Sequence, residues 1–177
     1  MTPIKILAKI ITDTFIVGND NSGNPIYVES SRVVIENQNQ FIAPTQGILV
    51  YISHDSKTTY GVAKAYKYDE PNDEFSETID QAFISTFAIE LYSRDSSAIE
   101  LQDTLLLYLN SYKSEQIQYD YNVTIAPINS SWSSLGFLEG ASRLNRFRIS
   151  LSMYHGKQII SNANYFKEIN LSTTTNL

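Results

Sequence analysis

The clearest hydrophobic pattern lies in residues 82–107, which read AFISTFAIELYSRDSSAIELQDTLLL. In the first half, apolar residues recur at even spacing, which places them on one face of a strand. These residues are Phe83, Phe87, Ile89 and Leu91. The second half has helical periodicity, and Ser97 followed by Glu100 predicts a capping box at the start of a helix over 98–112. A buried strand that leads into an amphipathic helix predicts a sheet on which that helix packs.

Other alternating segments supply the rest of this sheet. We predict strands over 33–35, 47–53, 58–68, 116–126 and 143–154. In 143–154 the inward residues are Phe147, Ile149, Leu151 and Met153; in 116–126 they are Ile117, Tyr119, Tyr121, Val123 and Ile125. A turn is expected at 54–56, between the second and third of these strands.

The chain begins with a second helical pattern. Residues 3–17 carry apolar side chains at helical spacing, Thr2 and Pro3 predict the helix start, and Gly18 predicts its end. Its apolar stripe is expected to pack on the sheet or on a neighbouring subunit. The turn cluster NDNSGNP over 19–25 has the polar spacing of a calcium loop but lacks its glycine and distal glutamate, so we interpret it as a plain turn.

The order of these elements predicts an α+β fold, a mainly antiparallel sheet with two helices packed on one face. We expect one domain over 1–160 and a C-terminal extension or arm over 161–177. The acidic segment 69–77, DEPNDEFSE, is expected to form the mobile tip of a hairpin between two strands.

Composition narrows the function classes. Of 177 residues, 42% are hydrophobic, enough for a core, and the net charge is −6. No basic run is present, which argues against a phosphate-binding footprint for nucleic acid. The absence of cysteine excludes disulfides and thiolate metal sites. We find no apolar stretch of about 18 residues and no signal-peptide pattern, so we expect a protein made in the cytosol.

Catalytic chemistry has little support in the sequence. His54 and His155 fall in predicted turns and are expected at the surface; nothing local supports a metal site between them. The chain has neither a glycine-rich phosphate loop nor a GxSxG elbow. We therefore expect no enzymatic activity, no catalytic residues, no metal and no cofactor.

Two groups of side chains stand out as a candidate interface with another subunit or with a tube. The first comprises the tyrosines of the 58–68 strand and the acids that follow it: Tyr60, Tyr66, Tyr68, Asp69, Glu70, Asp73 and Glu74. Tyr60, Tyr66 and Tyr68 are expected on one face of that strand. The second group is Arg143, Arg146 and Arg148, of which the last two share the outer face of the final strand. These arginines form either a solvated face or the complement of an acidic surface on a neighbouring subunit.

Three segments in this order resemble the phage neck terminator family, the tail-terminator or tail-completion proteins of tailed phages. They are VIENQN (34–39) followed by a proline and the 47–53 strand, QAFISTFAIELYSRDSSAIEL (81–101), and SRLNRFRISLSMY (142–154). The resemblance covers about residues 4–160. The extension after 160 and the acidic 69–77 segment depart from the family pattern.

The resemblance implies a tail-terminator-like subunit of a hexameric ring at the neck of a virion. Such a ring caps the tail tube, stops polymerisation of tube and sheath, and joins the tail to the head-side connector while DNA passes through its lumen. The expected partners are copies of the same chain, the tube protein, the sheath protein and the connector, with no membrane. The alternatives are another neck or connector ring protein, or a tyrosine-rich module that binds a small molecule or glycan.

Overall fold

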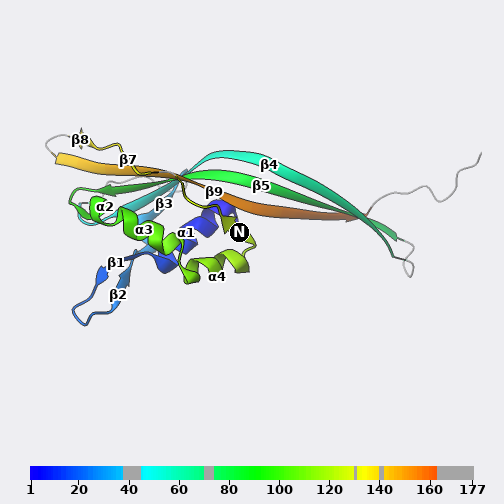
Figure 1. The fold of residues 1–177 in the computed structure, drawn as a ribbon, viewed down its shortest axis with the longest axis horizontal. Helices are drawn as coiled ribbons and strands as arrows, with labels where there is room; N and C mark the ends of the chain where they lie inside the picture. Colours follow the sequence, from blue (N-terminus) through cyan, green and yellow to red (C-terminus); the bar gives the residue numbers. More distant parts are fainter. Residues whose placement is uncertain (38–44, 70–73, 130, 140–141, 163–177) are drawn as a thin grey trace, which may run out of the picture.

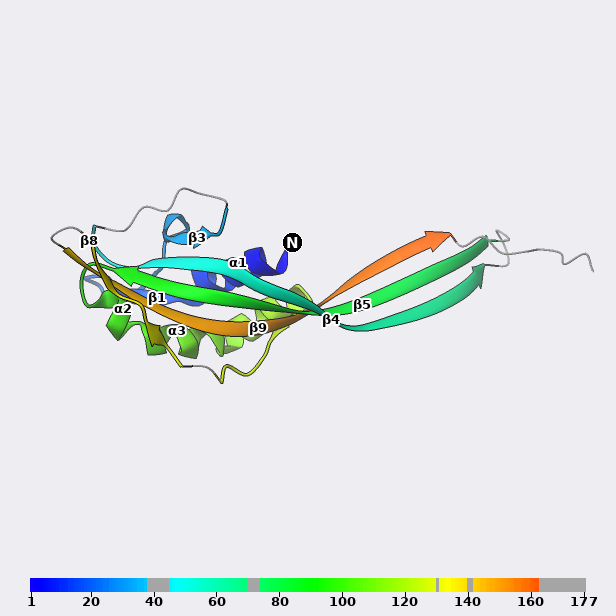
Figure 2. The same ribbon diagram turned by 90° about the horizontal axis from the view of Figure 1, so that it is seen from above.

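The computed structural model describes residues 1–37, 45–69, 74–129, 131–139 and 142–162. A layer of helices covers one half of a long sheet, and the other half projects beyond that layer (Figures 1 and 2). The helices are α1 (Pro3–Thr14), the short 3-10 helix η1 (Ser30–Arg32), α2 (Ser97–Glu100), α3 (Gln102–Leu109) and α4 (Tyr112–Asp120). The strands are β1 (Ile16–Asn19), β2 (Pro25–Tyr27), β3 (Val33–Ile35), β4 (Leu49–Asp69), β5 (Glu74–Ser93), β6 (Val123–Ile125), β7 (Ser133–Ser134), β8 (Phe137–Glu139) and β9 (Ser142–Asn162).

The main sheet has the order β3-β4-β5-β9-β6, and β7 and β8 also pair with β9. β3 is parallel to β4, whereas the other neighbours are antiparallel. β1 and β2 form a separate hairpin. The predicted α+β class with a mainly antiparallel sheet is confirmed. The number of helices is not, because four α-helices rather than two lie within the described residues.

β4, β5 and β9 are far longer than predicted, at 20 or 21 residues each. The segments 47–53 and 58–68 are one strand, so the turn predicted at 54–56 is wrong. A bulge between His54 and Ser56 takes its place, since one extra residue bends a strand without ending it. β9 likewise continues to Asn162, two residues into the predicted extension; residues 163–177 lie outside the described part of the chain.

α1 begins with Pro3 in its first turn, as predicted, but it ends at Thr14 rather than at Gly18. Its buried stripe packs on the sheet, which selects the first of the two expected placements. The stripe comprises Ile6, Leu7, Ile10 and Ile11. Gly18 lies within β1, and residues 20–24 connect β1 to β2. The plain turn predicted there is confirmed: the Asp20 carboxylate accepts hydrogen bonds from the backbone N–H groups of Ser22 and Asn24, both at 2.8 Å.

The start of the second helix is capped differently from the prediction. Ser97 and Glu100 both lie inside α2, so they form no capping box. Instead, the Asp95 carboxylate accepts the Ser97 N–H at 2.9 Å, and Ser93 Oγ accepts the Ala98 N–H at 3.0 Å. The crossover from β5 into the helices is therefore fixed from the strand side, by residues that precede the helix.

The strand predicted over 116–126 is wrong for most of its length, because α4 occupies Tyr112–Asp120 and only Val123–Ile125 is extended. In α4 the buried residues are Ser114 and Ile117, three positions apart, whereas Tyr119 is 88% exposed. Period-two alternation of tyrosine with polar residues thus coincided with a helix that has a narrow buried stripe. The Ser111 side chain caps this helix through the Ser114 N–H.

The core lies between the helices and one face of β4, β5 and β9. Ile149, Leu151 and Met153 face it, as predicted, and Phe147 is partly buried against it. Directly opposite residues share a face in antiparallel strands, so Ile52, Ile89 and Ile149 form one row of this face. The same rows continue beyond the helix layer, where none of the described helices covers them (Figure 2).

Candidate functional site: an exposed β-sheet arm

The most distinctive surface is the uncovered end of the sheet, which we call the arm. It comprises Gly61–Asp69 of β4, Glu74–Ala82 of β5 and Gly156–Asn162 of β9, and we call the rest of the protein the body. Three antiparallel strands extend from the body for about 30 Å at the usual rise per residue. Every residue of β4 from His54 to Asp69 is exposed. The arm is therefore a sheet with two solvent-facing sides.

The arm starts where three small residues lie opposite one another, Gly61, Ala82 and Gly156. This row lies one residue beyond His155, the last residue of β9 that pairs with β6. Small side chains put few steric limits on strand twist at this row. Figure 2 shows the three ribbons turning nearly edge-on between body and arm.

One side of the arm continues the core-facing side of the sheet and is rich in apolar residues. Its large side chains are Val62, Tyr66, Tyr68, Phe75, Ile79 and Ile159. Tyr66 and Ile159 are 59% and 51% exposed. Tyr66 donates a hydrogen bond to Glu77 at 3.0 Å, and Lys64 pairs with the same carboxylate at 3.4 Å. The apolar side chains are thus held among polar partners on an open surface.

Tyr60 does not belong to this side, contrary to the prediction that it shares a face with Tyr66 and Tyr68. A bulge between Thr59 and Gly61 shifts the alternation at this point. The Tyr60 ring packs edge-on against Tyr154, with 6.0 Å between ring centroids. Tyr154 lies opposite Ile84, next to the row in which Phe83 and His155 face the core. Because side chains alternate along a strand, Tyr154 lies on the opposite side of the sheet. The bulge therefore moves Tyr60 to the opposite side of the sheet.

The predicted acidic group is divided by the structure. Asp69 ends β4 and lies opposite Glu74, which begins β5, so these residues form the far end of the arm as a hairpin. Glu70 and Asp73 fall outside the described residues. Glu77 belongs to β5 rather than to a loop. The acids of the segment 69–77 that the structure describes are accordingly strand residues of the arm.

The arginines lie in the body, at the opposite end of β9. Arg146 donates two hydrogen bonds to Glu90, at 3.0 and 2.9 Å, and Glu90 is only 2% exposed. Arg148 pairs with Asp55 at 2.7 Å and lies 3.5 Å from Glu90. The hydrogen bond and charge of Glu90 raise the pKa of Arg146. Arg146 and Arg148 do share the outer side of the strand, as predicted.

This network corrects one of the two interpretations of the arginines. Arg146 and Arg148 are not a freely solvated face, because Glu90 and Asp55 of the same chain pair with them. That the arginines complement an acidic surface on a neighbouring subunit stays a prediction. Tyr92 also donates to Glu90, and burial followed by that bond raises the pKa of its phenol. Arg143 lies in β9 opposite Leu138 of β8. The interface proposed from the sequence therefore has its tyrosines and its arginines at opposite ends of the molecule.

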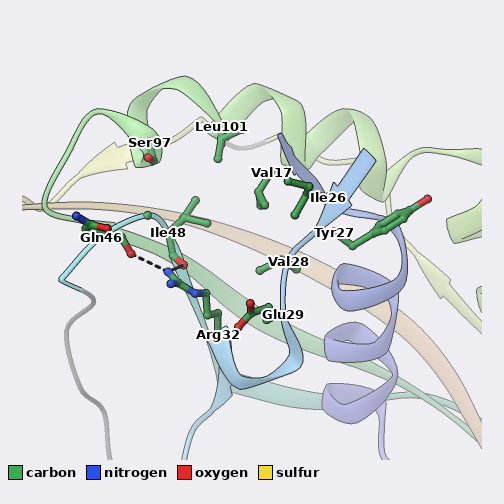
Figure 3. A pocket seen from close by; sticks show the side chains of 11 residues that line it. Val17, Ile26, Tyr27, Val28, Glu29, Arg32, Gln46, Ile48, Ser97 and Leu101 are labelled. Atoms are coloured by element: carbon green, nitrogen blue, oxygen red, sulfur yellow. Dashed lines mark hydrogen bonds between the residues drawn. The ribbon is translucent and has the colours of Figure 1, made fainter. Parts of the chain in front are cut away.

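The body contains a cavity of about 310 Å³ between the β1–β2 hairpin, η1 and the start of α2. Figure 3 shows the side chains that line it. Arg32 points across it and donates to the carbonyl oxygens of Gln46 and Ile48, at 2.7 and 3.3 Å. These bonds tie the entry of β4 to η1. The remaining lining is mostly apolar, with Val17 and Leu101 on facing elements. The arginine is used structurally, so this cavity has no obvious chemistry.

Sequence reasoning missed the placement of the two histidines. Both lie in strands rather than turns, on the core-facing side of the sheet where the body meets the arm. Ser85 Oγ lies 2.9 Å from Nε2 of His155. Burial lowers the pKa of His155, and the charges of Lys57 and His54 lower it further. No carboxylate lines the cavity beside this pair within the described residues, so a serine–histidine–acid arrangement is not formed there.

Within the described ranges, no cluster of three or more histidine or acidic residues is arranged to hold a metal ion. The helices of that same part of the chain are all too short or too polar to cross a membrane. No protein-family model matches this chain, and no curated protein matches it either.

Proposed function

We propose that the protein is a structural subunit of a tailed phage, a tail terminator or neck protein that forms a ring of identical copies. In this proposal the ring has six subunits, caps the tail tube, stops its polymerisation and joins it to the head-side connector. DNA passes through the lumen. The observation that supports the proposal most is the arm, a long sheet that the described residues of the subunit leave uncovered on both sides.

An exposed sheet of this kind favours a partner. Large apolar side chains such as Tyr66 and Ile159 gather on one side of the arm, and contiguous apolar patches usually mark interaction surfaces. The outer edges of β4 over 61–67 and of β9 over 156–161 have no strand partner within the described residues. Unpaired edges readily accept another chain, although Lys64 and Lys67 discourage unspecific pairing.

A ring follows if the arm of one copy lies on the body of the next. Such a head-to-tail contact joins unlike surfaces, and it produces a closed ring when the repeated rotation from copy to copy returns to the first subunit. The arm and the body are unlike surfaces at opposite ends of the subunit (Figure 1). In this scheme the protein acts by binding alone, to its own copies, to the tube, to the sheath and to the connector.

The net charge of −6 is compatible with a DNA channel. A lumen that repels phosphates lets DNA slide, whereas basic residues would release counterions and bind it. Many acidic proteins share this property, so the charge supports the proposal less than the arm does.

The proposal is tested by imaging the purified protein in negative stain, alone and with tail tubes. We expect rings, or single subunits that assemble into caps at tube ends. The double variant Tyr66→Ser/Ile159→Ser should lose both, because it removes the exposed apolar centre of the arm. Its matched control is Leu107→Ser/Tyr112→Ser, which removes two side chains that are each 74% exposed on the helix layer. Rings that survive the arm variant as well as the control variant would contradict the proposal.

A second candidate, a small-molecule or glycan-binding module, is favoured by the exposed Tyr60–Tyr154 pair. Aromatic rings at a surface provide apolar area with a polar tip, which suits such ligands. A protein that stays monomeric and ignores tubes would favour this module. Rings that join connectors without capping tubes would instead favour another neck protein.

A further inference from the structure

A small cavity with a mostly apolar lining and a few cationic and polar groups lies at the root of the arm, and the only two histidines of the chain line it. Its volume is about 270 Å³. The first residues of the chain close one side, and the core-facing side of the sheet forms the floor. The lining residues are Thr2, Pro3, Ile4, His54, Lys57, Ser85, Phe87 and His155.

Strand register brings the polar side chains together. Lys57 of β4 lies opposite Ser85 of β5, and His54 lies opposite Phe87 in the next row toward the body. His155 of β9 lies opposite Phe83, in the next row toward the arm. These rows are two residues apart, so all of them face the same side of the sheet.

Contacts within the cavity hold these groups in place. His155 stacks on the Phe83 ring at 5.3 Å and meets Ser85 Oγ through Nε2 at 2.9 Å. The Lys57 ammonium lies 3.7 Å from the centroid of the same Phe83 ring. His54 lies against Phe87, with ring centroids 5.3 Å apart. The ammonium and imidazole groups are therefore preorganised before any ligand arrives.

The positive charge of this cluster has no carboxylate beside it. The lining contains no acidic residue within the described part of the chain. Asp55, which follows His54 in sequence, is turned away to the outer side of the sheet and binds Arg148 at 2.7 Å. The lowered pKa of His155, caused first by burial and then by Lys57 and His54, agrees with an uncompensated cationic site.

We propose that this cavity binds a small oxyanion, a phosphate group or a carboxylate. The Lys57 ammonium supplies a charge-assisted hydrogen bond, and the imidazole N–H groups that are not used in the Ser85–His155 hydrogen bond supply further donors. A metal ion does not suit the site, because Lys57 would repel it and only two imidazoles are present. The proposal does not depend on ring formation.

The two histidines provide a direct probe, because no other imidazole contributes signals. Long-range ¹H–¹⁵N spectra of both rings are recorded while inorganic phosphate is added at constant ionic strength, with chloride as the reference anion. We expect saturable shifts of both rings with phosphate and not with chloride. Lys57→Gln should weaken phosphate binding about tenfold, because it removes a charge-assisted bond. The matched control is Lys64→Gln, a β4 lysine in the arm, which should leave affinity unchanged.

The source of the oxyanion is distinguished by protein concentration. Saturation by phosphate in dilute protein identifies a free anion. Ring shifts that grow with protein concentration in phosphate-free buffer, and that added phosphate reverses, identify a carboxylate of a second copy. Shifts that remain linear and equal for phosphate and chloride would overturn the proposal, as would equal phosphate affinity in Lys57→Gln and the parent chain.

Discussion

The body and the arm are built from the same three strands, yet only the body has a core. In the body, Ile149 of β9 is 1% exposed beneath the helices; ten residues later on the same side of the same strand, Ile159 is 51% exposed. Register and alternation do not change between the two positions. What changes is the layer that covers them, because the helices end and no other described segment takes their place (Figure 1).

This difference shows that strand pattern and burial are separate properties. The body half of the sheet is stabilised by apolar area removed from water, whereas the arm relies on strand pairing and cross-strand contacts. The three strands of the arm are continuous with those of the body, so the arm is ordered as a continuation of the body. Its exposed apolar side contributes free energy only when another chain covers it.

The largest expected effect comes from the matched pair Ile149→Ala and Ile159→Ala. Ile149→Ala should lower the free energy of unfolding by about 3 kcal/mol, since it leaves a cavity in the core. Ile159→Ala should change it by less than about 0.5 kcal/mol, as for an exposed site. Urea unfolding of both variants measures this. Similar losses at the two sites would mean that the arm is part of the folded core.

Removing a buried charge from the body should likewise cost more stability than removing a charge from the arm. Glu90→Gln leaves Arg146 and Arg148 facing a buried neutral amide, so the free energy of unfolding should fall. We expect a loss of about 2 kcal/mol, smaller than for a fully buried ion pair, because the two arginines are partly exposed to solvent. Glu77→Gln, on the same strand in the arm, should cost less than about 0.5 kcal/mol. Thermal unfolding compares the two variants, and a larger loss for Glu77→Gln would contradict this account.

Two glycines offer a smaller contrast. Gly47 has φ +70°, and a Cβ there would lie 3.0 Å from Nη1 of Arg32, so Gly47→Ala should destabilise by about 1 kcal/mol. Gly61, at the root of the arm, has open space around it. Gly61→Ala should be close to neutral in the same unfolding assay. A destabilising Gly61→Ala would indicate that the small-residue row itself holds the arm in place.

The smallest effect is expected from pH, at the boundary between the two regions. Burial lowers the pKa of His155 below its ordinary value of 6.5, so the folded protein takes up this proton less readily than the unfolded chain. The resulting stability is present above pH 6.5 and is lost as pH falls through the folded pKa. Urea unfolding between about pH 7.5 and about pH 5 measures this loss, in a buffer without oxyanions. His155→Gln should flatten the profile; an unchanged slope would exclude His155 as its source.

The sequence predicted those elements whose pattern has one interpretation. Alternation through Phe87 to Leu91 and through Ile149 to Met153 located the central strands, and Thr2-Pro3 located the start of α1. It failed where local signals compete. Polar residues at His54–Ser56 resemble a turn but form a bulge. The alternating segment 116–120 belongs to α4, whose buried residues are only Ser114 and Ile117.

The candidate site was foreseen in part. Tyr66 and Tyr68 do lie on an exposed strand, but the length of the arm cannot be predicted from the sequence, because the alternation of β9 continues unchanged from covered to uncovered rows. The pairing of Arg146 with Glu90 depends on register between strands that are 56 residues apart. The histidine cavity likewise depends on a β5–β9 register that links Ser85 with His155, 70 positions away.

The most direct test of the central claim is the mass of the protein in solution, measured by light scattering over a range of concentrations. We predict a discrete assembly at six times the subunit mass, which Tyr66→Ser/Ile159→Ser converts to monomer while Leu107→Ser/Tyr112→Ser retains it. Unfolding free energies of the two double variants should match that of the parent chain. A parent chain that is monomeric at every concentration, or an arm variant that still assembles, would contradict the assignment of the arm as the assembly surface.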